Sequence, residues 1–418
     1  MKVLIKHATI VNPSSPFNGL AKDIYIKDGI ISAIADSIKE KADTTIEGKN
    51  LSVSIGWMDI FSHFCDPGYE HRETLETGAK AAAAGGFTEV MVIPNTNPVI
   101  HSKSQIEYII QKSKDFTVTI HPIGSITKNT EGKELAEMYD MHQSGAIAFS
   151  DGINSIQQPG ILLKALQYVL AFDGTVIQLP EDKSISPHGL INEGIISTQL
   201  GLPGKPAIAE ELMIARDIEL VKYTGSKIHF TGVSTKKSIE LIAKAKADGL
   251  KVFCSVTPYH LFFCDEDLTT YDTNLKVNPP LRTKEDMLAL RDAVKKGTVD
   301  CFASHHIPQN TDNKICEFEY AKNGMIGLES LFGSALSVIS SPTSVTDLLT
   351  ISPRKIFGLS IPEIKEGAKA NLTLFDTTTE FIFEELMIRS KSKNSAFIGK
   401  KLKGKVIGII NGDKIALN

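Results

Sequence analysis

Residues 57–95 read WMDIFSHFCDPGYEHRETLETGAKAAAAGGFTEVMVIPN and contain one complete structural unit of the chain. They begin inside the apolar run LSVSIGWMDIF (51–61), pass through the helix-like segment HRETLETGAKAAAAGG (71–86) and end in a second apolar run, FTEVMVIPN (87–95). Short apolar runs separated by helical segments indicate parallel strands connected by helices. This stretch therefore predicts a strand, a helix and a second, parallel strand.

The same alternation continues to about residue 358. After the first two runs it includes FTVTIHPIGS (116–125), GAIAFSD (145–151), GTVIQLP (174–180), KIHFTGVS (227–234), LKVFCSVTP (250–258) and GTVDCFAS (297–304). Eight strand–helix units over roughly 300 residues fit a closed (β/α)8 barrel better than an open sheet. We therefore predict an α/β fold with a TIM-type barrel over residues 51–365.

The two flanks differ from the barrel in their patterning. Residues 1–50 and 366–418 read as short alternating strands, with Asp-Gly at 28–29 and Asn-Gly at 411–412 as hairpin turns. We expect both flanks to pair into one composite β-sandwich domain beside the barrel.

Composition narrows the function classes. The 418 residues carry a net charge of −4 and show no run of like charges, so nucleic-acid and membrane partners are not expected. No signal peptide and no membrane-spanning run is evident. The five cysteines follow no CxxC spacing and indicate reduced thiols in a cytoplasmic protein. A symmetric homodimer is the default expectation for assembly.

In a barrel of this kind, chemistry takes place where the strands end. The first strand ends in Asp59, Phe61 and His63, which point to the same side because side chains alternate along a strand. A strand that delivers two histidines to a metal reads Asp-x-His-x-His, so an apolar ring stands where the first histidine is expected. Taken alone, these three residues form an ordinary buried strand end.

Many motifs along the chain resemble bacterial dihydroorotase of the amidohydrolase superfamily. They are DPGYEHRETLETGAKAAAAGGFTEVMVIPNTNPV (66–99), AFSDG (148–152), LPEDKSI (179–185), LINEG (190–194), TPYHLFF (257–263), LKVNPPLRTKED (275–286), MIGLES (325–330) and SKSKNSAF (390–397). The resemblance covers essentially the whole chain in order. It implies a metal-bearing barrel with a small β domain and a role in pyrimidine biosynthesis.

The resemblance also implies a binuclear zinc site, which can be compared position by position. Two ligand positions, His63 and Asp151, are retained, whereas three that carry histidine in the family are Phe61, Leu179 and Gly232. The catalytic aspartate position is occupied by His305, and the substrate-binding arginine is replaced by Cys65. Two further substrate-contact positions, Asn95 and Asn278, are retained.

These replacements bear directly on catalysis. Zinc lowers the pKa of bound water from about 15.7 to about 7, which amounts to about 12 kcal/mol in forming hydroxide. A catalytic zinc needs three protein ligands, and His63 with Asp151 supply only two. We therefore predict that no catalytic residue remains and that no cofactor is bound. The open alternative is one zinc ion in a site rebuilt from His63, Asp151 and His305.

The same residues could instead have purely structural roles. His63 and Asp151 could be hydrogen-bonded core groups, Asn95 and Asn278 could cap turns, and Cys65 could be an inert filler. Because adjacent strand residues face opposite sides, only one of His305 and His306 can reach the site.

The resemblance extends to inactive dihydroorotase-like chains that assemble with aspartate carbamoyltransferase. It implies a non-catalytic structural partner of that enzyme as the first functional hypothesis. One alternative is an active hydrolase that converts dihydroorotate to N-carbamoyl-aspartate or opens a related cyclic amide. A second alternative is a small-molecule sensor that uses the residual pocket.

Overall fold

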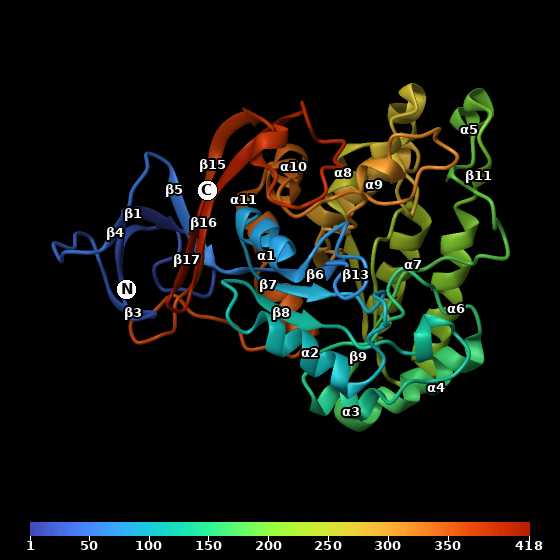
Figure 1. Ribbon diagram of the computed structural model, residues 1–418, viewed down its shortest axis with the longest axis horizontal. Coiled ribbons are helices and arrows are strands. Elements are labelled where there is room, and N and C mark those ends of the chain that lie inside the picture. The colour runs from blue at the N-terminus through green and yellow to red at the C-terminus, as the bar shows by residue number, and fades with distance from the viewer.

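The computed structural model describes residues 1–418, and Figure 1 shows a barrel beside a smaller β domain. The named barrel strands are β6 (Trp57–Ser62), β7 (Phe87–Val92), β8 (Thr119–Pro122), β9 (Thr175–Gln178), β12 (Lys227–Phe230), β13 (Val252–Val256) and β14 (Cys301–Phe302). All of their pairings are parallel.

The barrel closes through three short bridges. Strands β6-β7-β8 form one sheet and β9-β12-β13-β14 another. Phe149 forms parallel bridges with both Gly124 and Val176, and Ser62 forms one with His306. The predicted fourth strand is thus reduced to the residues around Phe149. The (β/α)8 prediction is confirmed.

Helices surround the strands (Figure 1). They are α1 (Leu75–Ala84), α2 (Lys103–Ser113), α3 (Met138–Gln143), α4 (Pro159–Val169), α5 (Ile195–Leu200), α6 (Ile208–Thr224), α7 (Lys236–Ala247), α8 (Pro258–Phe262), α9 (Lys284–Lys295), α10 (Leu331–Ile339), α11 (Pro342–Asp347) and α12 (Ile351–Ile356). None of them is both long and apolar enough to cross a membrane.

Helix α1 illustrates how local sequence fixes the geometry. Thr74 caps its N-terminus, and the side chains of Thr74 and Thr77 satisfy each other's backbone N–H groups. Gly78 lets the helix approach the segment after β6, because a Cβ there would lie 2.6 Å from the ring of Phe64. The alanines that follow in this helix pack in the main hydrophobic core.

Both chain termini build the β domain, where blue and red strands lie side by side in Figure 1. Its strands are β1 (Lys2–Ile10), β2 (Ala21–Lys27), β3 (Ile30–Ala35), β4 (Thr44–Ile46), β5 (Leu51–Ile55), β15 (Asn371–Ile382), β16 (Lys401–Asn411) and β17 (Lys414–Leu417). They form a single sheet in the order β17-β16-β15-β5-β1-β2-β3, with β4 beside β1. Both flanks therefore pair into one hydrogen-bonded β domain beside the barrel.

The domain boundary lies at Gly56 and not at residue 51. Strand β5 pairs with β1 and β15, whereas β6, which begins at Trp57, belongs to the barrel. No side chain fits at the crossing point, since a Cβ on Gly56 would lie 1.9 Å from Asn371 Oδ1. Residues 51–55 therefore belong to the β domain.

Part of the C-terminal flank returns to the barrel. Between β15 and β16, Phe383, Ile388 and Phe397 pack in one apolar cluster with Tyr259, which lies in α8. The indole of Trp57 also joins the two parts, with ring centroids 4.6 Å from Phe332 and 5.2 Å from Phe375. The prediction that 366–418 belongs wholly to the β domain therefore holds only for its paired strands.

Candidate functional site

A cavity of about 880 Å³ lies where the barrel strands end. Its wall includes six of the predicted site residues, from β6 and from the segments after β6, β7, β9, β14 and α8: Phe61, His63, Asn95, Leu179, Asn278 and His305. The barrel fold thus brings these residues together. Asp151, Cys65 and Gly232 lie next to the cavity but do not line it.

Phe61 and His305 fill one side of this region with two packed rings. Their centroids are 4.5 Å apart at an interplanar angle of 31°, and both side chains are buried. The His305 Nε2 atom lies 2.8 Å from Thr231 Oγ1, whereas its Nδ1 has no partner. Burial, and the neighbouring His260 and His229, lower the pKa of His305 to about 3, so its imidazole is neutral at pH 7.

Gly232 belongs to the same arrangement. It adopts φ +69°, and a Cβ at this position would lie 2.5 Å from His305 Cε1. The ring of His305 therefore occupies the space into which a side chain at residue 232 would project.

Both ring nitrogens of His63 are used within the protein. The backbone N–H of Cys65 donates to Nδ1 at 2.9 Å, so the proton is on Nε2, which donates to the Asn95 carbonyl at 2.9 Å. Burial, with Arg72 nearby, lowers the pKa of His63 to about 4. Neither nitrogen of the neutral imidazole has a free lone pair for a metal.

Asp151 is bound to the backbone of the β8–α3 connection. Its Oδ1 accepts from the N–H groups of Ile126 and Thr127, both at 2.9 Å, and its Oδ2 accepts from the Thr127 hydroxyl. Burial raises the pKa of Asp151 to about 6 despite these bonds. The carboxylate thus fixes a loop.

Asp59 connects the first and last barrel strands. It accepts from Ser62 Oγ at 2.6 Å, Ser304 N at 2.7 Å and Ser304 Oγ at 2.8 Å. Burial raises its pKa, and these hydrogen bonds oppose the rise. Asp59 therefore stabilises barrel closure next to the Ser62–His306 bridge.

The residues around His63 are also buried or bound to other parts of the protein. Cys65 is fully buried at φ +61°, and burial raises the pKa of its thiol to about 12. Asn95 donates from Nδ2 to the Asp151 carbonyl at 3.0 Å and accepts from Ile153 N at 3.1 Å. These side chains hold the ends of neighbouring strands in register.

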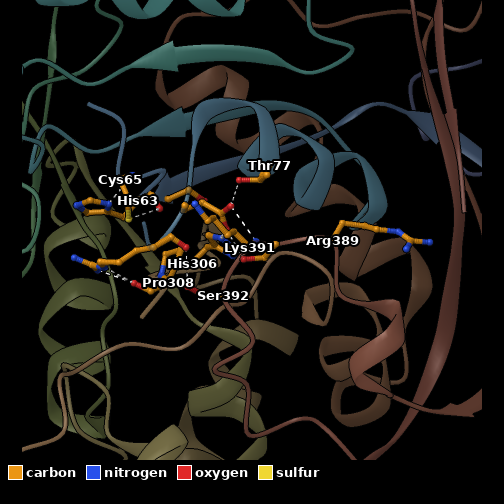
Figure 2. Close-up of polar contacts among 12 residues, drawn as sticks. His63, Cys65, Thr77, His306, Pro308, Arg389, Lys391 and Ser392 are labelled. Carbon is orange, nitrogen blue, oxygen red and sulfur yellow. Dashed lines mark hydrogen bonds and ion pairs between the residues drawn. The ribbon is translucent and has the colours of Figure 1, made fainter. Parts of the chain in front are cut away.

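His306 points away from the cavity, as strand alternation requires, and meets a buried carboxylate. Its Nε2 lies 3.4 Å from Glu73 Oε2. Glu73 also accepts from the Ser390 and Thr77 hydroxyls and from Lys391 N at 3.1 Å. Figure 2 shows Thr77, His306 and Lys391 gathered in this cluster. Glu73 therefore fastens the 389–394 segment to the barrel.

Comparison with known proteins identifies the family. The "Dihydro-orotase-like" sequence family matches residues 52–238. Over 420 residues the chain is 39% identical to a dihydroorotase of Acetivibrio thermocellus, covering 99% of this chain and 98% of that protein. The chain belongs to the dihydroorotase family. A dihydroorotase of Syntrophus aciditrophicus is 36% identical over 414 residues, 97% of each chain.

Solved structures agree on the fold of this dihydroorotase-family chain. An L-hydantoinase (dihydropyrimidinase) from Arthrobacter aurescens superposes with a TM-score of 0.84 at 22% identity, covering 100% of this chain and 96% of that one. A D-hydantoinase gives a TM-score of 0.81 at 20% identity, covering 100% and 95%. These matches show that the barrel and its β domain share the fold of those enzymes.

The zinc pair implied by the family resemblance does not fit the residues of this dihydroorotase-family chain. No group of three or more His, Cys, Asp or Glu side chains is arranged to hold a metal ion. His63 and Asp151 are committed to internal hydrogen bonds, while Phe61 and Leu179 offer no donor atom. His305 bonds to Thr231 and does not join the other two in a metal-binding group.

One polar cluster in the cavity of this dihydroorotase-family chain was not predicted from the sequence. Lys205 Nζ donates to Glu181 and, at 2.9 Å, to Asn278 Oδ1, and Asn278 Nδ2 donates to Glu181 Oε2 at 2.9 Å. Glu181 follows β9, Lys205 lies in β11 (Gly204–Lys205) and Asn278 precedes α9, so no spacing rule links them. Asn278 is therefore a network residue and more than a turn cap.

Proposed function

We propose that this dihydroorotase-family chain is non-catalytic and serves as a structural partner of aspartate carbamoyltransferase. The observation that supports the loss of catalysis is the contact between Gly232, His305 and Phe61. Two rings and a missing side chain stand where three ligand or catalytic groups are expected from the resemblance.

His305 and Cys65, which stand at the catalytic and substrate-binding positions, do not replace the lost chemistry. Opening a cyclic amide requires an activated nucleophile and a group that takes up oxyanion charge. A histidine whose pKa is about 3 is a weak base at pH 7, and a cysteine whose pKa is about 12 stays a thiol. Neither His305 nor Cys65 can activate water on its own.

The partner follows from the resemblance to inactive chains that assemble with aspartate carbamoyltransferase. The intact scaffold supports it, because the family fold persists over the full chain although the metal-binding positions have changed. Mixing both purified proteins at micromolar concentration and measuring mass by light scattering tests the proposal. A stable hetero-complex is expected, and two unchanged single-protein peaks would contradict it.

An active hydrolase is the second candidate, and the names of the 36–39% identical relatives favour it. The deciding measurement is zinc stoichiometry on protein purified without chelator, followed by a dihydroorotate hydrolysis assay with added zinc or manganese. We expect far less than one metal per chain and no turnover. One tightly held ion with turnover would establish the hydrolase instead.

A further inference from the structure

The cavity is too large for a single small ring. Its volume of about 880 Å³ lies near the upper end of the roughly 300–1,000 Å³ typical of ligand pockets. The almost fully buried side chains of Phe61, Leu179 and His305 form its floor, and the first two are apolar. The floor suits a planar ring, and the remaining space suits an extension from that ring.

The charges lining the cavity are unequal. Three fixed cations line it, namely Arg72, Lys183 and Lys205, and Glu181 is the only carboxylate among the lining residues. The difference is 3 − 1, or two positive charges. A phosphate monoester carries about −1.5 to −2 at pH 7, which matches this excess.

The cations also retain unused donors. Lys205 Nζ has three N–H groups, of which Glu181 and Asn278 take two. Arg72 uses Nε and Nη2 on the Pro308 carbonyl, at 2.8 and 2.6 Å, and so keeps three of its five N–H groups. Lys183 has only a 3.4 Å contact with Asn154 Oδ1.

The Glu181–Asn278 pair holds Lys205 in place. Lys205 is 8% exposed, and burying an ammonium is costly unless it is paired. Burial raises the pKa of Glu181, but Lys205 and Asn278 outweigh it and lower the pKa overall. Glu181 thus remains charged at pH 7, and one N–H of Lys205 is still available.

We propose that the cavity binds a nucleoside monophosphate, with its planar base against Phe61 and Leu179 and its phosphate at Lys205, Lys183 and Arg72. This inference rests on the proposed function, because it requires a pocket that binds without hydrolysing. The phosphate would replace water on donors that the protein leaves unused. The charge-assisted hydrogen bonds to it would supply most of the selectivity.

Titration calorimetry on the full chain tests this with uridine 5′-monophosphate and adenosine 5′-monophosphate. Uridine, inorganic phosphate and dihydroorotate are the matched probes. We expect saturable binding of at least one nucleotide, at least tenfold weaker binding of uridine and of phosphate alone, and weaker nucleotide binding at higher salt. No binding of either nucleotide at millimolar concentration, or equal binding of uridine, would overturn the proposal.

Two variants locate the phosphate. Lys205→Met and Lys183→Met are each expected to weaken nucleotide binding at least tenfold, while Lys236→Met, which removes an exposed lysine paired with Glu285, leaves it unchanged. Because Lys183 is exposed, its variant remains informative if Lys205→Met fails to fold. The site would be rejected if Lys183→Met and Lys205→Met both bound the nucleotide as tightly as the wild type. If Lys205→Met fails to fold, Arg72→Met takes its place in this comparison. Dihydroorotate turnover in the same preparation would instead refute the proposed function, so the two failures are distinguishable.

Discussion

The imidazole of His305 packs on the ring of Phe61 with centroids 4.5 Å apart, and its Cε1 occupies the space beside Gly232. One contact therefore joins three strand ends of the barrel. The residues at positions 61, 232 and 305 depend on one another, because a larger residue at 232 would collide with the imidazole of His305. This coupling makes the arrangement accessible to mutagenesis.

Gly232→Ala is expected to destabilise the protein by about 2 kcal/mol or more, since it adds a Cβ at positive φ and in contact with His305. In a His305→Ala background the same change should cost less, leaving mainly the backbone strain. Urea unfolding of the four proteins in a double-mutant cycle measures the difference. Identical costs in both backgrounds would show that the ring does not fill the space at residue 232.

The pH dependence of stability should reflect buried neutral histidines. Burial lowers the pKa of His260 to about 4, while its Nε2–H donates toward the Pro279 and Pro280 carbonyls at 3.1 and 3.2 Å. A lowered histidine pKa gives stability that is complete above the unfolded value of 6.5 and is lost as pH falls toward 4.

Between pH 7 and pH 5, His260 alone should cost on the order of 2 kcal/mol of unfolding free energy. His260→Gln keeps polar atoms at this position but cannot titrate, so its stability should fall less over this range. Denaturant midpoints at the two pH values provide the test, and parallel declines in both proteins would contradict it.

Glu73→Gln should release the segment 389–394 from the barrel. The carboxylate accepts from Ser390, Thr77 and Lys391 N, and an amide can satisfy only part of this set. We expect a loss of about 2 kcal/mol. Limited proteolysis should cut within this segment first, whereas Glu76→Gln, on the exposed side of α1, should digest like the wild type.

Thiol reactivity should separate one cysteine from the other four. Cys65, Cys254, Cys264 and Cys301 are buried, and burial raises their thiol pKa values; Cys316 is half-buried. A thiol-specific reagent at pH 8 should modify one cysteine rapidly in the native protein and all five in denaturant. Cys316→Ser should abolish the rapid phase, and rapid modification that persists in this variant would place a second accessible thiol in the fold.

Much of the architecture follows from local patterning. Alternating apolar runs predicted the barrel, and the Asp-Gly and Asn-Gly turns predicted the paired flanks. The boundary at Gly56 could not be seen, because β5 and β6 are buried along their entire length and read as one continuous apolar run. The short fourth strand likewise depends on neighbours that the sequence does not reveal.

The sequence by itself determined which atoms are missing from the site: no imidazole stands at Phe61, Leu179 or Gly232, whatever the fold. Tertiary structure decided what the remaining atoms do. The Cys65 N–H binds the Nδ1 lone pair of His63, and the Asn95 carbonyl accepts its Nε2–H. Glu73 meets a segment more than three hundred residues away. Lys205, Glu181 and Asn278 meet although 24 to 97 residues separate them in the sequence. Hydrogen-bond partners and burial are set by residues distant in sequence, so only the folded chain specifies them.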